Sequence, residues 1–492
     1  MLDILLAFLV VLLVAKWWLS GQRKGLPPGP PFALPFVGHL YLLPKDPMSL
    51  LEKWRKKYGN VYMLKFGSQP ALFIHEHGFL CEALVKNHET FMNRNETFVT
   101  KTLLGCKGIF SLSGDAWKEQ RAFVHATLRD LGMGKNVMAE RIQEEVKHFL
   151  RSIEETKGQP TNFSNLITAT VCNIICGVVF GKRFSHKDEL FLELLSNLQF
   201  LFRELGTSMP IQFFPFLKYL PGDYFLYHES VHRCQRMKSV IWDMINKNGR
   251  KVNTNDESFE DLVQAYLTEI EKKKVAGITN TSIDEENLLH TVWNFFNAGT
   301  ETTSKTVIFC LLYLVYFQDI QEKLFQEIHE NIGTERSPQM SDKPKLKLLN
   351  AFLLETFRHS KMGPFAPDRV ASKDVVLKGF LIPKGTVIIP VFDSITQNKE
   401  VWGDPENFRP ERFLDEAKKD FTVFSVGKRN CVGEAMAVME LFLILSSMIQ
   451  RYQFLPERHG QKPSLETEFG FTRSPEPFKV RAVLRSNKKS TD

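Results

Sequence analysis

Cys431 stands out first, because its neighbours are those that tune a reactive sulfur. It lies in the stretch FSVGKRNCVG (424–433), two residues after Arg429, and the apolar run over 434–448 that follows is predicted to form a buried helix. Backbone amides at a helix N-terminus and nearby cations lower the pKa of a thiol and favour the thiolate. A thiolate serves as a nucleophile or as a metal ligand, and this stretch alone leaves both roles open.

A carboxylate and two hydroxyls interrupt the longest apolar helical pattern of the chain. The segment NFFNAGTETTSKT (294–306) lies inside a helix predicted over 282–317, and its Gly299 is followed by Glu301 and Thr302. Polar groups in such a helix face either solvent or a site, and the flanking phenylalanines leave little room for a solvated face. An acid beside an alcohol is suited to proton delivery.

Charged pairs at helical spacing form the third group of candidates. Glu355 and Arg358 lie at i,i+3, and Arg412 follows in the proline-containing sequence FRPERF. One glutamate with two arginines can fix a loop against a helix through bidentate hydrogen bonds. Trp117 and Arg121 share a helix face at i,i+4. Each pair taken alone is equally compatible with an ordinary surface pair.

The elements that position these residues are predicted to be mostly helices. A capping box of Ser282 and Glu285 is expected to begin the helix that carries Glu301. Helical periodicity predicts nine helices, over 135–157, 164–180, 187–205, 228–248, 258–274, 282–317, 318–332, 345–360 and 434–451. Alternating apolar residues predict short strands at 61–67, 71–76, 375–391 and near 478–484. The expected fold class is mainly α with small β-sheets (α+β), in one large domain.

The N-terminus is predicted to be an uncleaved membrane anchor. Residues 2–19 are almost wholly apolar and end in a tryptophan pair, with basic residues beyond it. A cleaved secretory signal is the alternative, but the charge follows the apolar run, and bulky residues replace a cleavage site. The expected organisation is an anchor over 1–20, a proline-rich spacer over 21–31 and a catalytic domain over 32–492. The positive-inside rule leaves that domain in the cytosol.

Composition excludes some functions. The net charge of +7, from 63 basic and 56 acidic residues, is too diffuse to indicate nucleic acid. Seven scattered cysteines are not a disulfide framework and favour a reducing compartment. The aromatic segment at 209–225 is either a buried loop or a second contact with the membrane.

In combination and in this order, WxxxR, AGxETT, ExxR, PERF and FxxGxRxCxG resemble the cytochrome P450 superfamily of haem-thiolate monooxygenases. The likeness covers the whole chain and is strongest to the microsomal family 2 group of animals. It implies a haem buried between the long central helix and the loop of Cys431, which would be the proximal iron ligand. Phe424 would shield the sulfur. Gly427 and Gly433 would permit a tight turn and a close approach to the porphyrin.

The resemblance also assigns roles position by position. The residues expected to bind the haem propionates are Arg94, Trp117, Arg121, Arg369 and Arg429. Ala298 and Gly299 would border the dioxygen groove, beside the oxygen-activating pair of Thr302 and Glu301. A structural role is expected for Glu355, Arg358 and Arg412. The positions that match substrate-contact segments are Phe110, Ser111, Asn297, Phe365, Ala366 and Phe471.

Two positions depart from the family pattern. Arg369 stands where many relatives have histidine, and either side chain can donate a hydrogen bond. Asn297 stands where relatives usually carry a small or apolar residue. Its amide would point toward substrate or bond to a neighbouring helix, and the second interpretation is favoured.

The implied activity is insertion of one oxygen atom of O2 into lipophilic small molecules, by hydroxylation or epoxidation of fatty acids, steroids or xenobiotics. The implied cofactor is haem b (iron protoporphyrin IX). Electrons would come from NADPH through the flavoprotein NADPH–cytochrome P450 reductase, with cytochrome b5 as a further partner, at the endoplasmic reticulum membrane. The alternatives are a reductase-independent haem-thiolate isomerase and a non-enzymatic haem binder. The substrate stays open.

Overall fold

The computed structural model describes residues 25–44, 46–249, 259–414 and 423–485. The expected anchor over 1–20 lies outside the described residues. Within the described ranges, no helix is both long enough and apolar enough to cross a membrane. Of the expected spacer, residues 25–31 are described and contain neither helix nor strand, as their prolines and glycines predict.

The chain falls into two compact units. The first comprises the described residues of Met1–Asn95, together with Phe365–Ile395 and Val426–Arg429. The second comprises those of Glu96–Pro364, Thr396–Ser425 and Asn430–Asp492.

The first unit is built on a four-stranded sheet of order β1-β2-β6-β3. Its strands are β1 (Val61–Phe66), β2 (Gln69–Ile74), β6 (Val387–Pro390) and β3 (Arg369–Val370). β2 pairs with β6 in parallel, and the other neighbours are antiparallel. The smaller elements are η1 (Leu40–Leu42), α2 (Met48–Tyr58), α3 (His77–Cys81), η2 (Glu82–Lys86), the hairpin β4 (Val375–Leu377) and β5 (Phe380–Ile382), and most of α16 (Phe392–Thr396).

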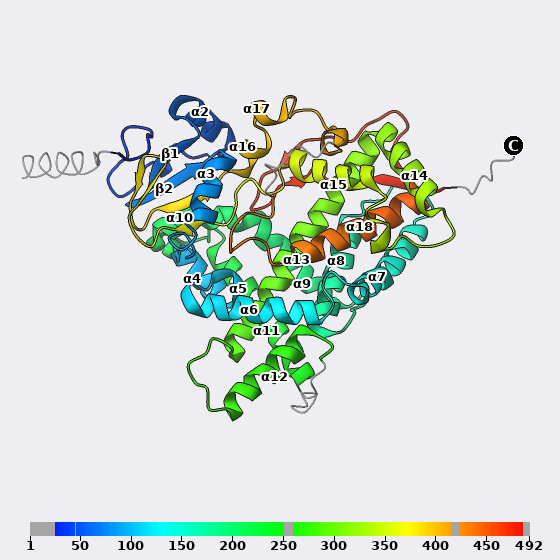
Figure 1. Ribbon diagram of the computed structural model, residues 1–492, viewed down its shortest axis with the longest axis horizontal. Coiled ribbons are helices and arrows are strands. Elements are labelled where there is room, and N and C mark those ends of the chain that lie inside the picture. Colours follow the sequence, from blue (N-terminus) through cyan, green and yellow to red (C-terminus); the bar gives the residue numbers. More distant parts are fainter. Residues whose placement is uncertain (1–24, 45, 250–258, 415–422, 486–492) are drawn as a thin grey trace, which may run out of the picture. The chain divides into compact units, whose positions relative to one another are not determined.

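The second unit is a helical body around α13 (Glu285–Tyr316), whose 32 residues span about 48 Å. α13 packs against α8 (Ser164–Phe180) and α18 (Glu434–Arg451), which flank it in Figure 1. The other α-helices before α13 are α4 (Phe98–Leu104), α5 (Gly108–Ser111), α6 (Gly114–Asp130), α7 (Asn136–Glu154), α9 (Glu189–Glu204), α10 (Met209–Phe213), α11 (Tyr227–Gly249) and α12 (Leu262–Val275). Those after it are α14 (Gln318–Ile332), α15 (Lys347–His359) and α17 (Lys399–Trp402).

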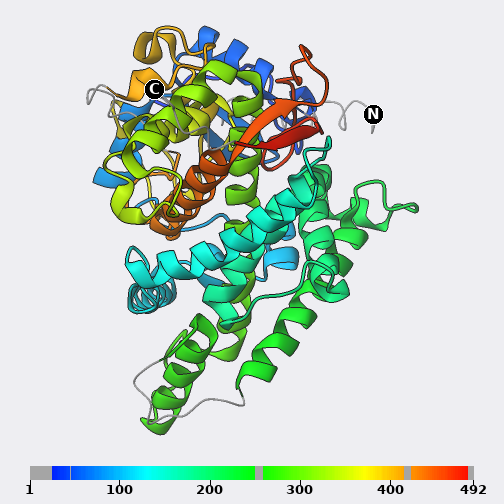
Figure 2. The same ribbon diagram turned by 90° about the vertical axis from the view of Figure 1, so that its right-hand side faces the viewer.

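Short 3-10 helices and two small sheets complete this unit. The 3-10 helices are η3 (Leu205–Ser208), η4 (Pro215–Tyr219), η5 (Met340–Asp342) and η6 (Pro410–Phe413). β7 (Tyr452–Pro456) and β10 (Val480–Leu484) pair antiparallel and are drawn in orange and red in Figure 2. β8 (Thr467–Glu468) and β9 (Ser474–Pro475) form a second hairpin.

All nine predicted helices are present, with ends that differ by a few residues, and the fold is mainly helical as expected. The predicted capping box is wrong. The N-cap of α13 is Asp284, whose carboxylate accepts from the N–H of Asn287 at 2.7 Å. The Ser282 hydroxyl instead donates to Glu119 in α6 at 2.7 Å. A partner on another helix therefore outcompetes the local capping role.

Candidate active site

The middle of α13 exposes two small side chains in an otherwise buried helix. From Asn287 to Val315 nearly every residue is buried, whereas Ala298 and Thr302 are exposed. They lie one turn apart and therefore share a face. The Thr302 hydroxyl donates to the carbonyl of Ala298 at 2.8 Å, so its lone pairs stay available to accept.

Glu301 lies on a different face from Thr302, because successive residues of a helix are about 100° apart. Its side chain is 2% exposed, and its Oε1 accepts a hydrogen bond from the Thr472 hydroxyl at 2.8 Å. Burial raises the pKa of Glu301, while the charge of Lys305 and the bond from Thr472 oppose that rise. The structure therefore does not bring the acid and the alcohol into direct contact.

α13 and α8 approach each other closely at Gly299. A Cβ built on it would lie 2.5 Å from Cδ1 and 3.0 Å from Cγ1 of Ile175. Atoms at such distances clash, so glycine lets the two helices pack at this level.

Cys431 sits just before α18, as predicted, and is exposed. Its N–H donates to the carbonyl of Phe424 at 2.9 Å, which closes the loop. The expectation that this environment lowers the pKa of the Cys431 thiol is wrong when only the groups of the protein act on it. Although one side of the residue is open, loss of water raises the pKa of Cys431, and the N–H of Gly433 and the charge of Arg121 only oppose that rise. Phe424 packs edge-on against Phe357, with ring centroids 5.3 Å apart.

Two glycines were expected to shape this loop. Gly427 has φ 79°, and a Cβ there would collide with the carbonyl of Leu84, so glycine is required. Gly433 has an ordinary φ of −93°. A Cβ on Gly433 would meet open space among the described residues, so the backbone itself does not demand glycine there.

Trp117 and Arg121 pair on α6 as their spacing predicts. The guanidinium lies 5.6 Å from the Trp117 ring centroid. It donates to the carbonyl of Asn430 at 2.9 Å and to its side-chain oxygen at 2.7 Å. Arg121 thereby anchors the residue next to Cys431.

In the first unit, hydrogen bonds to backbone carbonyls bring three of the expected arginines together. Arg94 donates to the carbonyl of Asp368 at 2.9 Å, and Arg369 donates to the same carbonyl at 3.1 Å. Arg369 also donates to the carbonyl of Arg429 at 3.2 Å. The structure thus brings Arg94, Arg369 and Arg429 together, and separately pairs Trp117 with Arg121.

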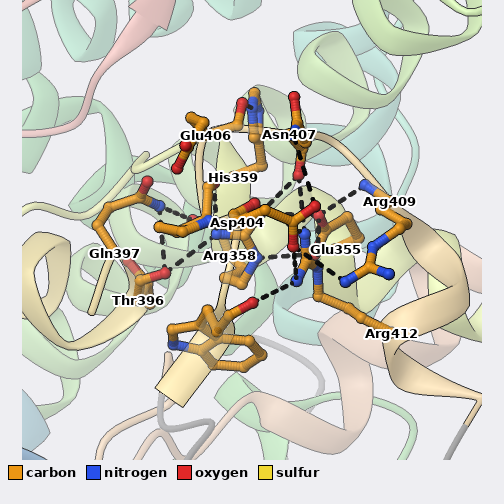
Figure 3. Close-up of polar contacts among 12 residues, drawn as sticks. Glu355, Arg358, His359, Thr396, Gln397, Asp404, Glu406, Asn407, Arg409 and Arg412 are labelled. Atoms are coloured by element: carbon orange, nitrogen blue, oxygen red, sulfur yellow. Dashed lines mark hydrogen bonds and ion pairs between the residues drawn. The ribbon is translucent and has the colours of Figure 1, made fainter. Parts of the chain in front are cut away.

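Glu355 is the centre of a fully buried ion network in the second unit (Figure 3). Arg358 binds both of its carboxylate oxygens, at 2.7 and 2.8 Å, and Arg412 binds Oε1 at 3.1 Å. The two guanidinium groups also donate to the carbonyls of Thr396, Trp402, Asp404, Pro405 and Asn407. The network therefore ties the loop before and after α17 to α15.

Three of the expected substrate positions lie in α5 and α13 of the second unit. Phe110 and Ser111 are in α5, where the N–H of Phe110 donates to the side chain of Asn294 in α13 at 3.1 Å. Asn297 donates to the carbonyl of Trp293 in its own helix at 2.8 Å, so the favoured bond to a neighbouring helix is wrong. Its Oδ1 is buried and has no hydrogen-bond partner among the described residues.

The remaining substrate positions are divided between the units. Phe471 lies between β8 and β9, and its ring packs on Phe202 with centroids 5.7 Å apart. Phe365 and Ala366 are in the first unit, where they bond to the backbone at the end of β6. These residues are mainly aromatic or small and carry no charge.

Sequence reasoning missed Thr472 and Asn430. Thr472 meets Glu301 across 171 residues of chain, and nothing in its local sequence signals that contact. Asn430 stands beside Cys431, and its amide could have been recognised as a partner for a nearby arginine.

Comparison with known proteins decides the family. A sequence model of the family "Cytochrome P450" matches residues 27–482. The chain belongs to the cytochrome P450 family. P450 enzymes bind a haem through a cysteine thiolate and use electrons from a redox partner.

Curated relatives at similar length support the assignment. Cytochrome P450 2J3 of Rattus norvegicus is 36% identical over 98% of this chain and 96% of its own. Cytochrome P450 2J2 of Homo sapiens is 34% identical over the same shares. Cytochrome P450 2C3 of Oryctolagus cuniculus is 36% identical over 91% of each chain. The chain is thus similar to family 2 P450 proteins.

The residues present fit a haem. Cys431 offers an accessible soft sulfur, and α13 exposes only small side chains at its centre. The guanidinium groups of the expected propionate-binding arginines suit the carboxylates of a porphyrin. As a P450 enzyme, the protein is a haem-thiolate monooxygenase that acts on lipophilic substrates.

Proposed function

We propose that this P450 is an endoplasmic reticulum enzyme that binds haem b and receives electrons from NADPH through NADPH–cytochrome P450 reductase, with cytochrome b5 as a second donor. Its catalytic domain, 32–492, would face the cytosol behind an anchor at 1–20 and a spacer at 21–31. The similarity to family 2 P450 proteins over nearly the whole chain supports this proposal.

Cys431 would hold the haem iron, and the bound haem would supply the oxygen-activating chemistry. Because a bound metal cation deprotonates a coordinating thiol, ligation would overcome the burial that otherwise raises the Cys431 pKa. The guanidinium groups of Arg94, Arg121, Arg369 and Arg429, with Trp117, would bind the propionates. Phe424 would cover the sulfur. Glu355, Arg358 and Arg412 would keep the loop geometry fixed.

The exposed hydroxyl of Thr302 is the observation that carries the monooxygenase assignment over the isomerase. The small, exposed Ala298 leaves space beside it, and its free lone pairs can hold a proton donor, such as a water molecule, over the reacting oxygen. Glu301 would supply protons to this position through water, since no direct contact joins the two side chains. An isomerase whose substrate carries its own peroxide oxygen needs no such delivery.

The substrate would lie among Phe110, Ser111, Phe365, Ala366 and Phe471, which favour a lipophilic molecule. Asn297 would add one polar feature. Its Nδ2 is held by the carbonyl of Trp293, which leaves Oδ1 as an acceptor for a hydroxyl or amide of the substrate.

Thr302→Ala is expected to lower the ratio of product formed to NADPH oxidised by at least tenfold, because proton transfer by positioned groups contributes about 10²–10⁴ in rate. Haem content and substrate binding should not change. The measurement uses purified enzyme with reductase and one lipophilic substrate, and hydrogen peroxide is followed in parallel.

Thr306→Ala is the matched control for this variant. Thr306 makes the same bond to the carbonyl four residues earlier, also at 2.8 Å, but its side chain is buried. The ratio of product formed to NADPH oxidised by Thr306→Ala should stay near that of the unmodified enzyme. An unchanged ratio in Thr302→Ala would contradict the proton-delivery role of Thr302, whereas product formation without NADPH and reductase would favour the isomerase.

The segment 209–225 is expected to bind membranes without the anchor. Phe216, Tyr219 and Tyr224 are 65%, 78% and 74% exposed, so the buried-loop alternative is wrong for them. Burial of the Phe216 side chain in lipid alone would contribute about 1.5–3 kcal/mol. Protein lacking residues 1–24 should therefore still float with phospholipid vesicles, and changing Phe216 and Tyr219 to serine should reduce binding at least tenfold.

Val275 and Ile278, which are also exposed, provide the control for that experiment. Serine at these two positions should leave vesicle binding unchanged. Complete loss of binding on removal of residues 1–24 alone would rule out the second contact.

A further inference from the structure

The turn between β8 and β9 places a hydroxyl against the acid of α13. The Thr472 Oγ1 donates to Glu301 Oε1 at 2.8 Å, and both side chains are buried. The turn also carries Phe471, one of the expected substrate contacts. The expected substrate contact and the residue bonded to the acid are therefore adjacent in the chain.

Backbone bonds fix this turn on both sides of Thr472. The N–H of Phe471 donates to the carbonyl of Phe202 at 3.2 Å, and the N–H of Arg473 donates to the carbonyl of Met362 at 2.7 Å. With both neighbours anchored, the backbone of Thr472 is held beside Glu301. This contact is thus built into the packing of the turn.

The other oxygen of the acid has a different environment. Glu301 Oε2 is buried and has no hydrogen-bond partner among the described residues. Lys305, one turn later in α13, is the charged group whose field acts on it. Arg473 is directed elsewhere, toward the Thr467 hydroxyl at 3.4 Å and the ring of Phe469. A buried carboxyl with one oxygen unbonded is favoured in its protonated form, with the proton on Oε2.

We propose that Thr472 is a positioning residue, which holds Glu301 through Oε1 so that Oε2 carries the exchangeable proton. The same bond links the turn that carries the substrate contact Phe471 to the acid. This inference rests on the proposed monooxygenase function. Oε2 gives its proton to a water molecule, which passes a proton on toward Thr302, and the carboxylate that remains keeps the Thr472 bond until a proton from bulk solvent replaces the one lost. Displacement of Phe471 by substrate would shift Thr472 and with it the acid.

Infrared spectroscopy of the protonated carboxyl band tests the contact without turnover. The Glu301→Gln variant identifies the band, which is then titrated in the unmodified holoenzyme and in Thr472→Val, Thr472→Ser and Thr467→Val. Valine keeps the shape of threonine but removes the donor that favours the charged carboxylate. The midpoint should rise by about one pH unit in Thr472→Val. Thr472→Ser keeps a hydroxyl donor, so its titration midpoint should match that of the unmodified enzyme. Thr467 lies in the same hairpin but does not bond to Glu301, so Thr467→Val should also leave the midpoint unchanged.

The ratio of product to NADPH oxidised tests the consequence. It should fall several-fold in Thr472→Val and recover in Thr472→Ser, and its dependence on pH should move with the infrared midpoint. An unchanged midpoint or an unchanged ratio in Thr472→Val would overturn the inference. If the unmodified enzyme forms no product with NADPH and reductase, the proposed function fails instead, while the infrared titration still reports on the contact.

Discussion

The Cys431→Ser variant is expected to lose completely the long-wavelength absorption of the reduced carbon monoxide complex from which P450 proteins take their name. Serine has nearly the same shape and keeps the N–H bond to the Phe424 carbonyl, so the loop should still fold. Its hydroxyl cannot replace a soft thiolate as an iron ligand. Difference spectra of the purified protein, at matched protein concentration, measure the effect.

Cys106→Ser is the control, because Cys106 is a partly buried free cysteine outside the loop. That variant should retain the full band. Retention of the band by Cys431→Ser would mean that another group holds the iron, and the assignment of the loop would then be wrong.

Arg412→Gln is expected to destabilise the protein by about 3–5 kcal/mol, the usual cost of removing one partner from a buried ion pair. Its side chain is 0% exposed and bonds to Glu355 and to the carbonyls of Trp402, Asp404 and Asn407. Glutamine is too short and has too few donors to replace those bonds. The midpoint of urea unfolding and the haem retained after purification are the measurements.

The same 3-10 helix region offers a closely matched control. Arg409 also pairs with Asp404, but its side chain is 51% exposed, and water screens the interaction. Its backbone N–H, which donates to Glu355 at 2.8 Å, is unaffected by substitution. Arg409→Gln should therefore barely change the midpoint. Equal effects of the two substitutions would show that the buried network does not hold the loop.

Features that depend on local pattern could be predicted from the sequence. The length of α13, the position of Cys431 before α18 and the pairing of Glu355 with Arg358 all follow from helical periodicity and spacing. The absence of a direct contact between the side chains of Glu301 and Thr302 also follows from helix geometry, since adjacent residues do not share a helix face.

Features that depend on distant contacts could not be predicted. Glu119 takes Ser282 away from the expected cap, and Thr472 reaches Glu301 from a hairpin far along the chain. Asn297 turns back to its own helix carbonyl, because no neighbouring helix offers it a bonded partner among the described residues. In each case the partner is set by tertiary packing, which periodicity does not encode.

The close fit of Gly299 against Ile175 constrains the order in which these two positions can evolve. Alanine at 299 would meet the Ile175 side chain at 2.5 Å, so it would be disfavoured as a first step. Valine at 175 removes the nearest atom, Cδ1, at a cost of about 0.5–1.5 kcal/mol. Descendants of this sequence should therefore acquire the smaller α8 residue before any side chain appears at 299, and the two sites should covary as a pair.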